Sequence, residues 1–290
     1  MNKKLVFSIS LVIVLLLFLG YRWGNQQFRY SNIEVNFATE ETFSPPSQEV
    51  LNILSSSTFE YLDRGKQSYV FSSRDGKYVL KFFDAHCFRS GPFPLLFPVS
   101  AKRCARKLQS LAEGYHLAWV KDRDNTGLLY VQLAANTSDL FEITVKDRFG
   151  IEHLIDLAKV PFVVQERAIP TRSLVSLLLD QGKIVEVEKL FEQLVAMYIT
   201  EYRRGLIDDD RNIMYNTGFV GEKPVRIDVG RLRYDEKIKD PSAYQENLER
   251  VFVGRVGSWL HRHYPQYEQD IKSIVNHGQG TVPKELTSHD

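Results

Sequence analysis

Apolar and polar residues alternate over short stretches in the first half of the chain, which is typical of β-strands. The turn 73–76 contains Asp75-Gly76, a pair that favours a tight hairpin between the strands on either side. A second hairpin is expected around 147–150. The expected strands cover 59–71, 77–83, 128–133, 141–145, 151–157 and 161–166. Residues 101–118 instead repeat apolar positions every three or four residues, so one helix is expected within this β-rich half.

Past Pro170 the apolar spacing becomes helical. One face of a helix of about 20 residues is marked by Ile184, Val187, Phe191, Leu194 and Tyr198. The helix is expected to end at 203–205, where two arginines precede a glycine. A further helix is expected over 244–263, and the polar tail 278–290 is expected to fray.

The N-terminus has a different pattern, because Leu5 to Gly20 are nearly all apolar. With Tyr21 and Trp23 the run reaches about 19 residues, close to the ~20 needed to cross a bilayer. It lacks the small-residue cleavage site of a secretory signal, so we expect an uncleaved single-pass anchor at 5–23 rather than a removed signal. The polar stretch 26–48 then predicts a linker.

Charge and composition narrow the possible functions only a little. The chain is 43% hydrophobic and has a net charge of +1, so no global positive field favours nucleic acid. Cys87 and Cys104 are the only cysteines, which excludes a disulfide framework. We expect both to be buried and reduced, although they could also pair. Lys3, Lys4 and the amino terminus slightly outweigh the cations after the span, which favours a domain outside the cytoplasm.

Three polar residues stand next to apolar strands in an informative order. Lys81 lies within the apolar run 78–83, after a hairpin that contains Gly65. Asn212 comes later, and Asp228 follows in a short strand that ends at a glycine. A strand lysine after a phosphate-cradling hairpin, followed by an asparagine and an Asp-x-Gly, is the order of a phosphoryl-transfer site. The alternatives are an edge-strand lysine in solvent and an aspartate that merely ends a strand.

Over about 59–232 this order resembles the protein-kinase-like superfamily, and more nearly its sugar and lipopolysaccharide-core kinases than full protein kinases. The resemblance implies an α+β fold with a β-rich N-lobe at 49–168 and a helical C-lobe at 169–277, after an anchor at 1–25. It also implies ATP and Mg²⁺ as cofactors. The implied cofactor-binding residues are Gly65, Lys81, Gln165 and Ala168, the last two by their backbone at the hinge near adenine, and the implied metal ligands are Asn212 and Asp228.

The motifs depart from the family pattern at several positions. Asp63 and Ser68 stand where two of the three hairpin glycines belong. Asp208 lies four residues before Asn212 where the pattern has five, so Asp208 is the first candidate for the catalytic aspartate and Asp210 the second. Asn216 is a second candidate for the metal-binding amide. The only acid of the helix 101–118 is Glu113, which lies opposite the apolar stripe and is therefore expected in solvent rather than on Lys81.

Three functions follow from these observations. The first is a membrane-anchored, ATP-dependent phosphotransferase that acts on a hydroxyl of a sugar, lipid or protein. The second is a non-catalytic relative that keeps the kinase-like fold as a scaffold. The third is an unrelated, membrane-tethered interaction domain.

Overall fold

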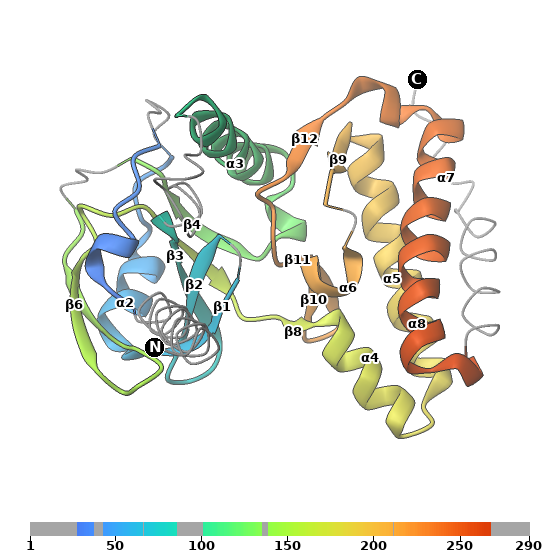
Figure 1. Ribbon diagram of the computed structural model, residues 1–290, viewed down its shortest axis with the longest axis horizontal. Helices are drawn as coiled ribbons and strands as arrows, with labels where there is room; N and C mark the ends of the chain where they lie inside the picture. The colour runs from blue at the N-terminus through green and yellow to red at the C-terminus, as the bar shows by residue number, and fades with distance from the viewer. Residues whose placement is uncertain are drawn as a thin grey trace, which may run out of the picture. The chain divides into compact units, whose positions relative to one another are not determined.

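The computed structural model describes residues 28–37, 43–65, 67–85, 101–134, 139–210 and 212–267. The chain forms two compact units, the first from residues 1–97 and 132–162 and the second from 98–131 and 163–290. Strands dominate the first and helices the second, so the fold is mixed α+β as expected (Figure 1). The expected lobe limits, 49–168 and 169–277, stay a prediction; the units group residues 98–131 with the helical part.

The largest sheet has seven strands in the order β4-β7-β3-β2-β1-β5-β6. Strands β1, β2 and β3 form antiparallel pairs, β5 and β6 form a hairpin, and β1 runs parallel to β5. The strand bounds are β1 Phe59–Arg64, β2 Ser68–Ser73, β3 Tyr78–Phe83, β4 Leu128–Gln132, β5 Glu142–Lys146, β6 Glu152–Asp156 and β7 Phe162–Glu166. The six ranges expected from the sequence therefore all contain strands.

The turn between β2 and β3 follows the expected Asp-Gly chemistry. Gly76 adopts a φ of 71°, which glycine reaches without steric cost. The carboxylate of Asp75 accepts hydrogen bonds from the Ser73 hydroxyl at 2.7 Å and from the Lys77 amide at 3.1 Å. These bonds fix the register that places Lys81 opposite Val70.

An N-terminal segment packs on the sheet of the first unit. Phe28 is buried, and its ring centroid lies 5.1 Å from each of the rings of Tyr69, Phe71 and His153. The Asn32 amide donates to the Tyr69 hydroxyl at 3.1 Å. The sequence predicted a linker at 26–48 and did not predict this packing. The short helix η1 (Tyr30–Asn32) lies within that range, and α2 (Gln48–Ser56) begins at its end.

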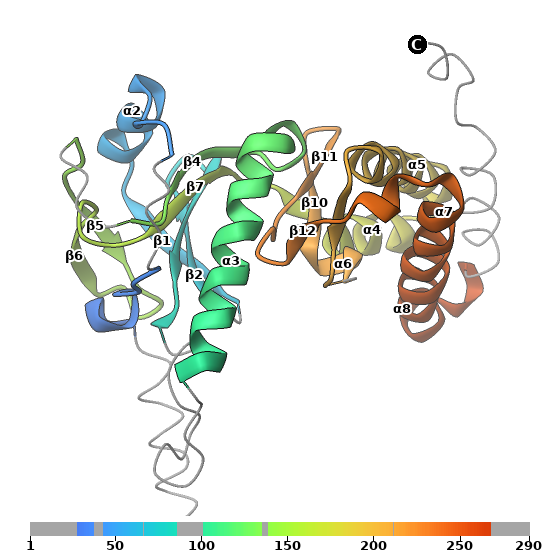
Figure 2. The same ribbon diagram turned by 90° about the horizontal axis from the view of Figure 1, so that it is seen from above.

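The second unit combines helices with two small sheets. β8 (Ile169–Pro170), β10 (Thr217–Val220) and β11 (Lys223–Arg226) form one sheet, and β9 (Leu206–Asp208) pairs with β12 (Leu232–Tyr234) in the other. The helices are α3 Ala101–Lys121, η3 Arg123–Asn125, α4 Thr171–Asp180, α5 Ile184–Arg203, α6 Ile213–Asn216, η4 Glu236–Lys239, α7 Pro241–Glu249, η5 Arg250–Val256, α8 Gly257–His263 and η6 Pro265–Tyr267. Figure 2 shows α3 as one long, continuous helix.

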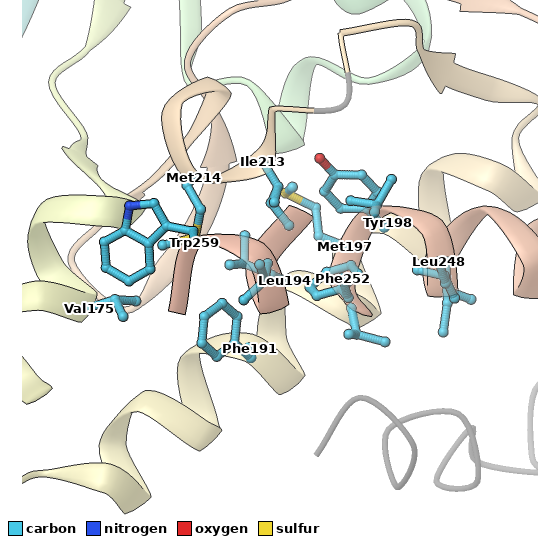
Figure 3. Close-up of a cluster of buried hydrophobic side chains, with 14 of the residues drawn as sticks. Val175, Phe191, Leu194, Met197, Tyr198, Ile213, Met214, Leu248, Phe252 and Trp259 are labelled. Atoms are coloured by element: carbon cyan, nitrogen blue, oxygen red, sulfur yellow. The ribbon is translucent and has the colours of Figure 1, made fainter. Parts of the chain in front are cut away.

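A cluster of apolar side chains forms the core of the second unit. Phe191, Leu194 and Tyr198 of α5 meet Phe252 and Trp259 of the C-terminal helices (Figure 3). Each fully buried side chain of this size contributes roughly 1.5–3 kcal/mol. The C-terminal helix was expected as one helix over 244–263; its middle segment, η5, is instead a π-helix.

The described residues include no helix long and apolar enough to span a membrane. The anchor expected at 5–23 lies outside the described residues, as does the tail 278–290.

Candidate functional site

Lys81 lies in β3, between β2 and β7 in the sheet, and its residue is only 6% exposed. An edge-strand lysine that points to solvent is therefore excluded. A buried ammonium group is costly unless opposite charge or hydrogen bonds compensate it. The expected role of Lys81 in binding phosphate stays a prediction.

The hairpin before Lys81 is braced by an ion pair. Arg64, at the end of β1, donates from Nε and Nη2 to Oδ2 of buried Asp84 at 3.0 and 2.5 Å. Its guanidinium also lies 4.6 Å from the Tyr69 ring centroid. The Gly65 amide donates to the Ser68 carbonyl at 2.9 Å, which closes the turn. Asp63 is exposed at the same end.

Glu113 has the solvent position that the sequence predicts. It is exposed on α3 and accepts a hydrogen bond from Gln109 Nε2 at 2.8 Å, one turn earlier on the same helix.

Asp228 follows β11 and is exposed. Its Oδ1 accepts the Gly230 amide at 3.0 Å, so the Asp-x-Gly segment forms a tight turn that orients the carboxylate. The amides of Ile227 and Asp228 donate to the Asn216 carbonyl at 2.7 and 3.3 Å. This pairing places the end of α6 beside Asp228.

Helix α3 packs closely on this turn. A Cβ atom on Gly114 would lie 2.4 Å from the Val229 carbonyl oxygen and 3.0 Å from the carbonyl carbon of Gly230. Only glycine fits there without moving one of the two backbones. The neighbouring Tyr115 is buried, and burial together with the carboxylate of Asp228 raises the pKa of its hydroxyl.

Asp208 is a structural carboxylate in this arrangement. It is 7% exposed; its Oδ1 accepts the Asp210 amide at 2.8 Å and its Oδ2 accepts Arg226 Nη1 at 2.9 Å. Burial raises the pKa of Asp208 to about 6, although Arg226 opposes this shift. With both oxygens occupied and little access to solvent, Asp208 is poorly placed to receive a substrate proton.

Asp210 is more accessible. It is half-buried, and no described residue donates a hydrogen bond to its carboxylate. Its backbone carbonyl accepts Asn216 Nδ2 at 3.2 Å and the Asn212 amide at 2.7 Å. Asn212 precedes α6 and is exposed, with no side-chain capping bond. Hydrogen bonds thus link Asp210 to Asn216, and Asn216 to Asp228, and the backbones of Asp210, Asn212 and Asp228 make these contacts while their side chains stay available.

A buried ion network lies directly behind these residues, and sequence reasoning missed it. Arg226 is fully buried; its Nε and Nη2 donate to the two carboxylate oxygens of Glu201 at 2.7 and 2.5 Å, while Nη1 binds Asp208. The guanidinium lies 4.6 Å from the Tyr198 ring centroid. One signal was visible in the sequence: Glu201 lies on the apolar face of α5, between Tyr198 and Tyr202.

The side chain of Gln165 belongs to the same network. Its Nε2 donates to the carbonyls of Arg226, at 2.9 Å, and Thr126. The side chain is therefore structural, and its expected role near adenine, through the backbone, stays a prediction. Ala168 is half-buried beside Gly218 and also remains a prediction.

The donors at this site suit Mg²⁺ in kind. In the described part of the chain, no three His, Cys, Asp or Glu side chains gather into a metal cluster. The candidate donors are instead the exposed carboxylate of Asp228 and the side-chain amide oxygen of exposed Asn212, since the second candidate, Asn216, is only 8% exposed. Mg²⁺ usually keeps several waters and takes one or two carboxylates plus substrate phosphates, so a sparse set of oxygen donors fits this ion.

No protein-family model matches the chain, and no curated protein matches it. Among solved structures the chain is similar to the bifunctional kinase-methyltransferase WbdD, at 15% identity over 77% of this chain and 45% of that chain, with a TM-score of 0.40. A second WbdD structure gives 14% identity, 79% and 47% coverage and a TM-score of 0.41. A third match is Rv3197 of Mycobacterium tuberculosis, in complex with erythromycin, at 13% identity, 66% and 53% coverage and a TM-score of 0.33.

The chain thus spans about half the length of these solved chains. The first match is a kinase-methyltransferase, and the sequence itself resembles kinase-like proteins. Because the identities are 13–15% and the TM-scores 0.33–0.41, we base the function on this chain's own residues.

Proposed function

We propose that the protein is a kinase-like phosphotransferase that uses ATP and Mg²⁺ to phosphorylate a hydroxyl acceptor. The observation that carries the proposal is the hydrogen-bonded group of Asp210, Asn216 and Asp228, whose backbone contacts hold the segment of the half-buried Asp210 carboxylate next to the turn of the exposed Asp228 carboxylate.

Each residue then has a role that its surroundings allow. Asp228 and Asn212 would hold Mg²⁺, which when bound neutralises the charge that develops on the transferred phosphoryl group. Lys81 would neutralise phosphate charge. Asp210 would orient the acceptor hydroxyl and accept its proton, because its carboxylate is half-exposed and that of Asp208 is not.

The membrane anchor at 5–23 belongs to the same proposal, as does its orientation. The small excess of cations before the span favours an outward-facing domain, whereas ATP-dependent chemistry requires a cytoplasmic one. A margin of about one charge is readily overridden, so we propose the cytoplasmic orientation for the enzyme. An outward-facing domain would instead support the non-catalytic scaffold.

Thermal unfolding of the detergent-solubilised full chain with ATP and Mg²⁺ tests the proposal. At a hundredfold excess over Kd, binding should add about 2.7 kcal/mol of stability. We expect Asp228→Ala to abolish the Mg²⁺-dependent part of this increase. Asp209→Ala serves as the matched control, because Asp209 is also an exposed aspartate, next to Asp210, but its carboxylate pairs with exposed Arg233. No stabilisation of the wild type, or equal stabilisation in Asp228→Ala, would leave only the scaffold.

A further inference from the structure

Arg226 lies two residues before Asp228, and its guanidinium binds the side chain of Asp208, two residues before Asp210. We infer that Arg226 is a positioning residue, which holds the loop of Asp210 and Asn216 in register with β11 and with the turn of Asp228 that follows it. The importance of that register for Mg²⁺ rests on the proposed function; the positioning itself does not.

The geometry of Arg226 leaves it a single orientation. Its three guanidinium nitrogens all donate, two to Glu201 on α5 and one to Asp208 at the end of β9. The side chains of Arg226 and Glu201 are fully buried and that of Asp208 nearly so. A buried arginine that binds two carboxylates in this way is rigid, because every alternative arrangement leaves a buried charge without a partner.

The backbone of Arg226 is fixed as well as its side chain. Its carbonyl accepts Gln165 Nε2 at 2.9 Å, and β11 pairs with β10 so that Arg226 lies opposite Thr217. Arg226 therefore joins β7, β9, β11 and α5 at one buried point. Asp228 lies two residues after Arg226, and Asp210 lies two residues after its partner Asp208. Fixing Arg226 and Asp208 therefore restricts the positions of both carboxylates.

Lysine is not an adequate replacement. A guanidinium presents donors in a planar fork that matches two carboxylates, whereas an ammonium is a compact point charge on a flexible stem. In Arg226→Lys the charge is kept but the bidentate contact with Glu201 is lost. We therefore expect the loop to loosen while the helices of the second unit stay folded.

Hydrogen exchange of the full chain without ligand measures this loosening directly. The amides of Asp210, Ile227 and Asp228 each donate a hydrogen bond within the loop and turn that Arg226 is inferred to position. In Arg226→Lys we expect them to exchange at least tenfold faster, whereas the Gln181 amide at the end of α4 keeps its rate. Arg233→Lys is the matched control, because Arg233 binds Asp209 and Asp235 in an exposed setting, and it should change none of these rates.

If Arg226→Lys fails to fold, Asp208→Asn provides the test, because it breaks the same link while Arg226 keeps Glu201. Unchanged exchange of the three amides in a folded variant would overturn the positioning role.

Magnesium titration in the presence of ATP separates this inference from the proposed function. We expect a folded Arg226→Lys to need at least tenfold more Mg²⁺ than the wild type for the same thermal shift, with ATP alone giving equal shifts in both. If ATP and Mg²⁺ gave no thermal shift in the wild type, the phosphotransferase proposal would be refuted. The hydrogen-exchange rates would still decide the role of Arg226. Equal Mg²⁺ requirements in the two proteins would overturn the inferred effect on the metal site.

Discussion

Asp122, at the end of α3, is a buried carboxyl group whose two oxygens have unequal surroundings. Its Oδ1 accepts Asn125 Nδ2 at 2.8 Å and Arg204 Nη1 at 3.1 Å, whereas Oδ2 has no hydrogen-bond partner. Burial and the nearby Glu201 raise the pKa of Asp122 to about 8. The Arg204 side chain is 42% exposed, so its attraction does not offset the cost of burying the charge.

We predict that Asp122→Asn removes a large part of the pH dependence of stability. The folded pKa lies above the ordinary value of about 3.9, so the protonated group stabilises the fold below pH ~4 and this contribution is lost as the pH rises through about 8. The introduced side-chain amide would also supply a donor where Oδ2 has no partner. At pH 8.5 we expect the variant to be more stable by on the order of a few kcal/mol, and near pH 4 to match the wild type.

Urea denaturation between pH 4 and pH 9 measures this difference. Asp124→Asn is the control, because Asp124 is exposed two residues away in η3. A parallel pH dependence in the wild type and Asp122→Asn would contradict the protonated state of Asp122.

The sequence indicated some candidate site residues and concealed others for a physical reason. Lys81 and Asp228 stood out through their order along the chain, because each alone also has an ordinary explanation, as an edge-strand lysine or as an aspartate that ends a strand. Arg226 did not, since its partners lie 18 and 25 residues away and only the folded chain brings them together. The choice between Asp208 and Asp210 likewise depended on burial, which spacing does not report.

At the scale of elements, the contact between α3 and the Asp228 turn rests on one glycine. In an exposed helix, Gly→Ala stabilises by roughly 1 kcal/mol because alanine is the better helix former. At Gly114 the added methyl group would meet the backbone of Val229 and Gly230. We predict that Gly114→Ala destabilises the protein by about 1–3 kcal/mol, the usual cost of overpacking, and weakens Mg²⁺-dependent ATP binding.

Gly254 offers the opposite case in the same chain. A Cβ atom there has no neighbour within 4 Å, so Gly254→Ala should be neutral or slightly stabilising. Chemical denaturation of both variants measures the contrast. If Gly114→Ala were as stable as Gly254→Ala, α3 would not pack on the turn as described.

Element type was well predicted because the apolar periods were long and distinct. The apolar period of α5 and the glycine that follows its last turn predicted the helix Ile184–Arg203 almost to the residue. Gly205 adopts a φ of 77°, a conformation that ends a helix. The π-helix η5 had no such signal, since Arg250–Val256 has the same apolar spacing as an ordinary helix and differs only in its hydrogen bonds. The many polar residues of 26–48 predict a linker and so concealed the packing of Phe28, although Ile33, Val35 and Phe37 alternate with polar residues there and are buried.

At the scale of the whole molecule, the anchor remains a prediction with a direct test. We expect residues 5–23 to be retained in the mature protein as a single membrane span, because the run is long enough and lacks a cleavage site. Intact-mass spectrometry of the protein from the membrane fraction should give the full N-terminus. A mature chain that starts after residue 20 would refute the anchor.

The packing of Phe28 on the sheet limits where an anchored protein can act. Phe28 lies only five positions after Trp23, the end of the expected span, and a fully extended chain of that length reaches about 17 Å. The first unit would then stay close to the lipid headgroups, because the segment that connects it to the span is short. Acceptors confined to the same bilayer would meet it by lateral diffusion in two dimensions at a high effective concentration, which favours lipids and lipid-linked sugars over molecules dissolved in bulk water.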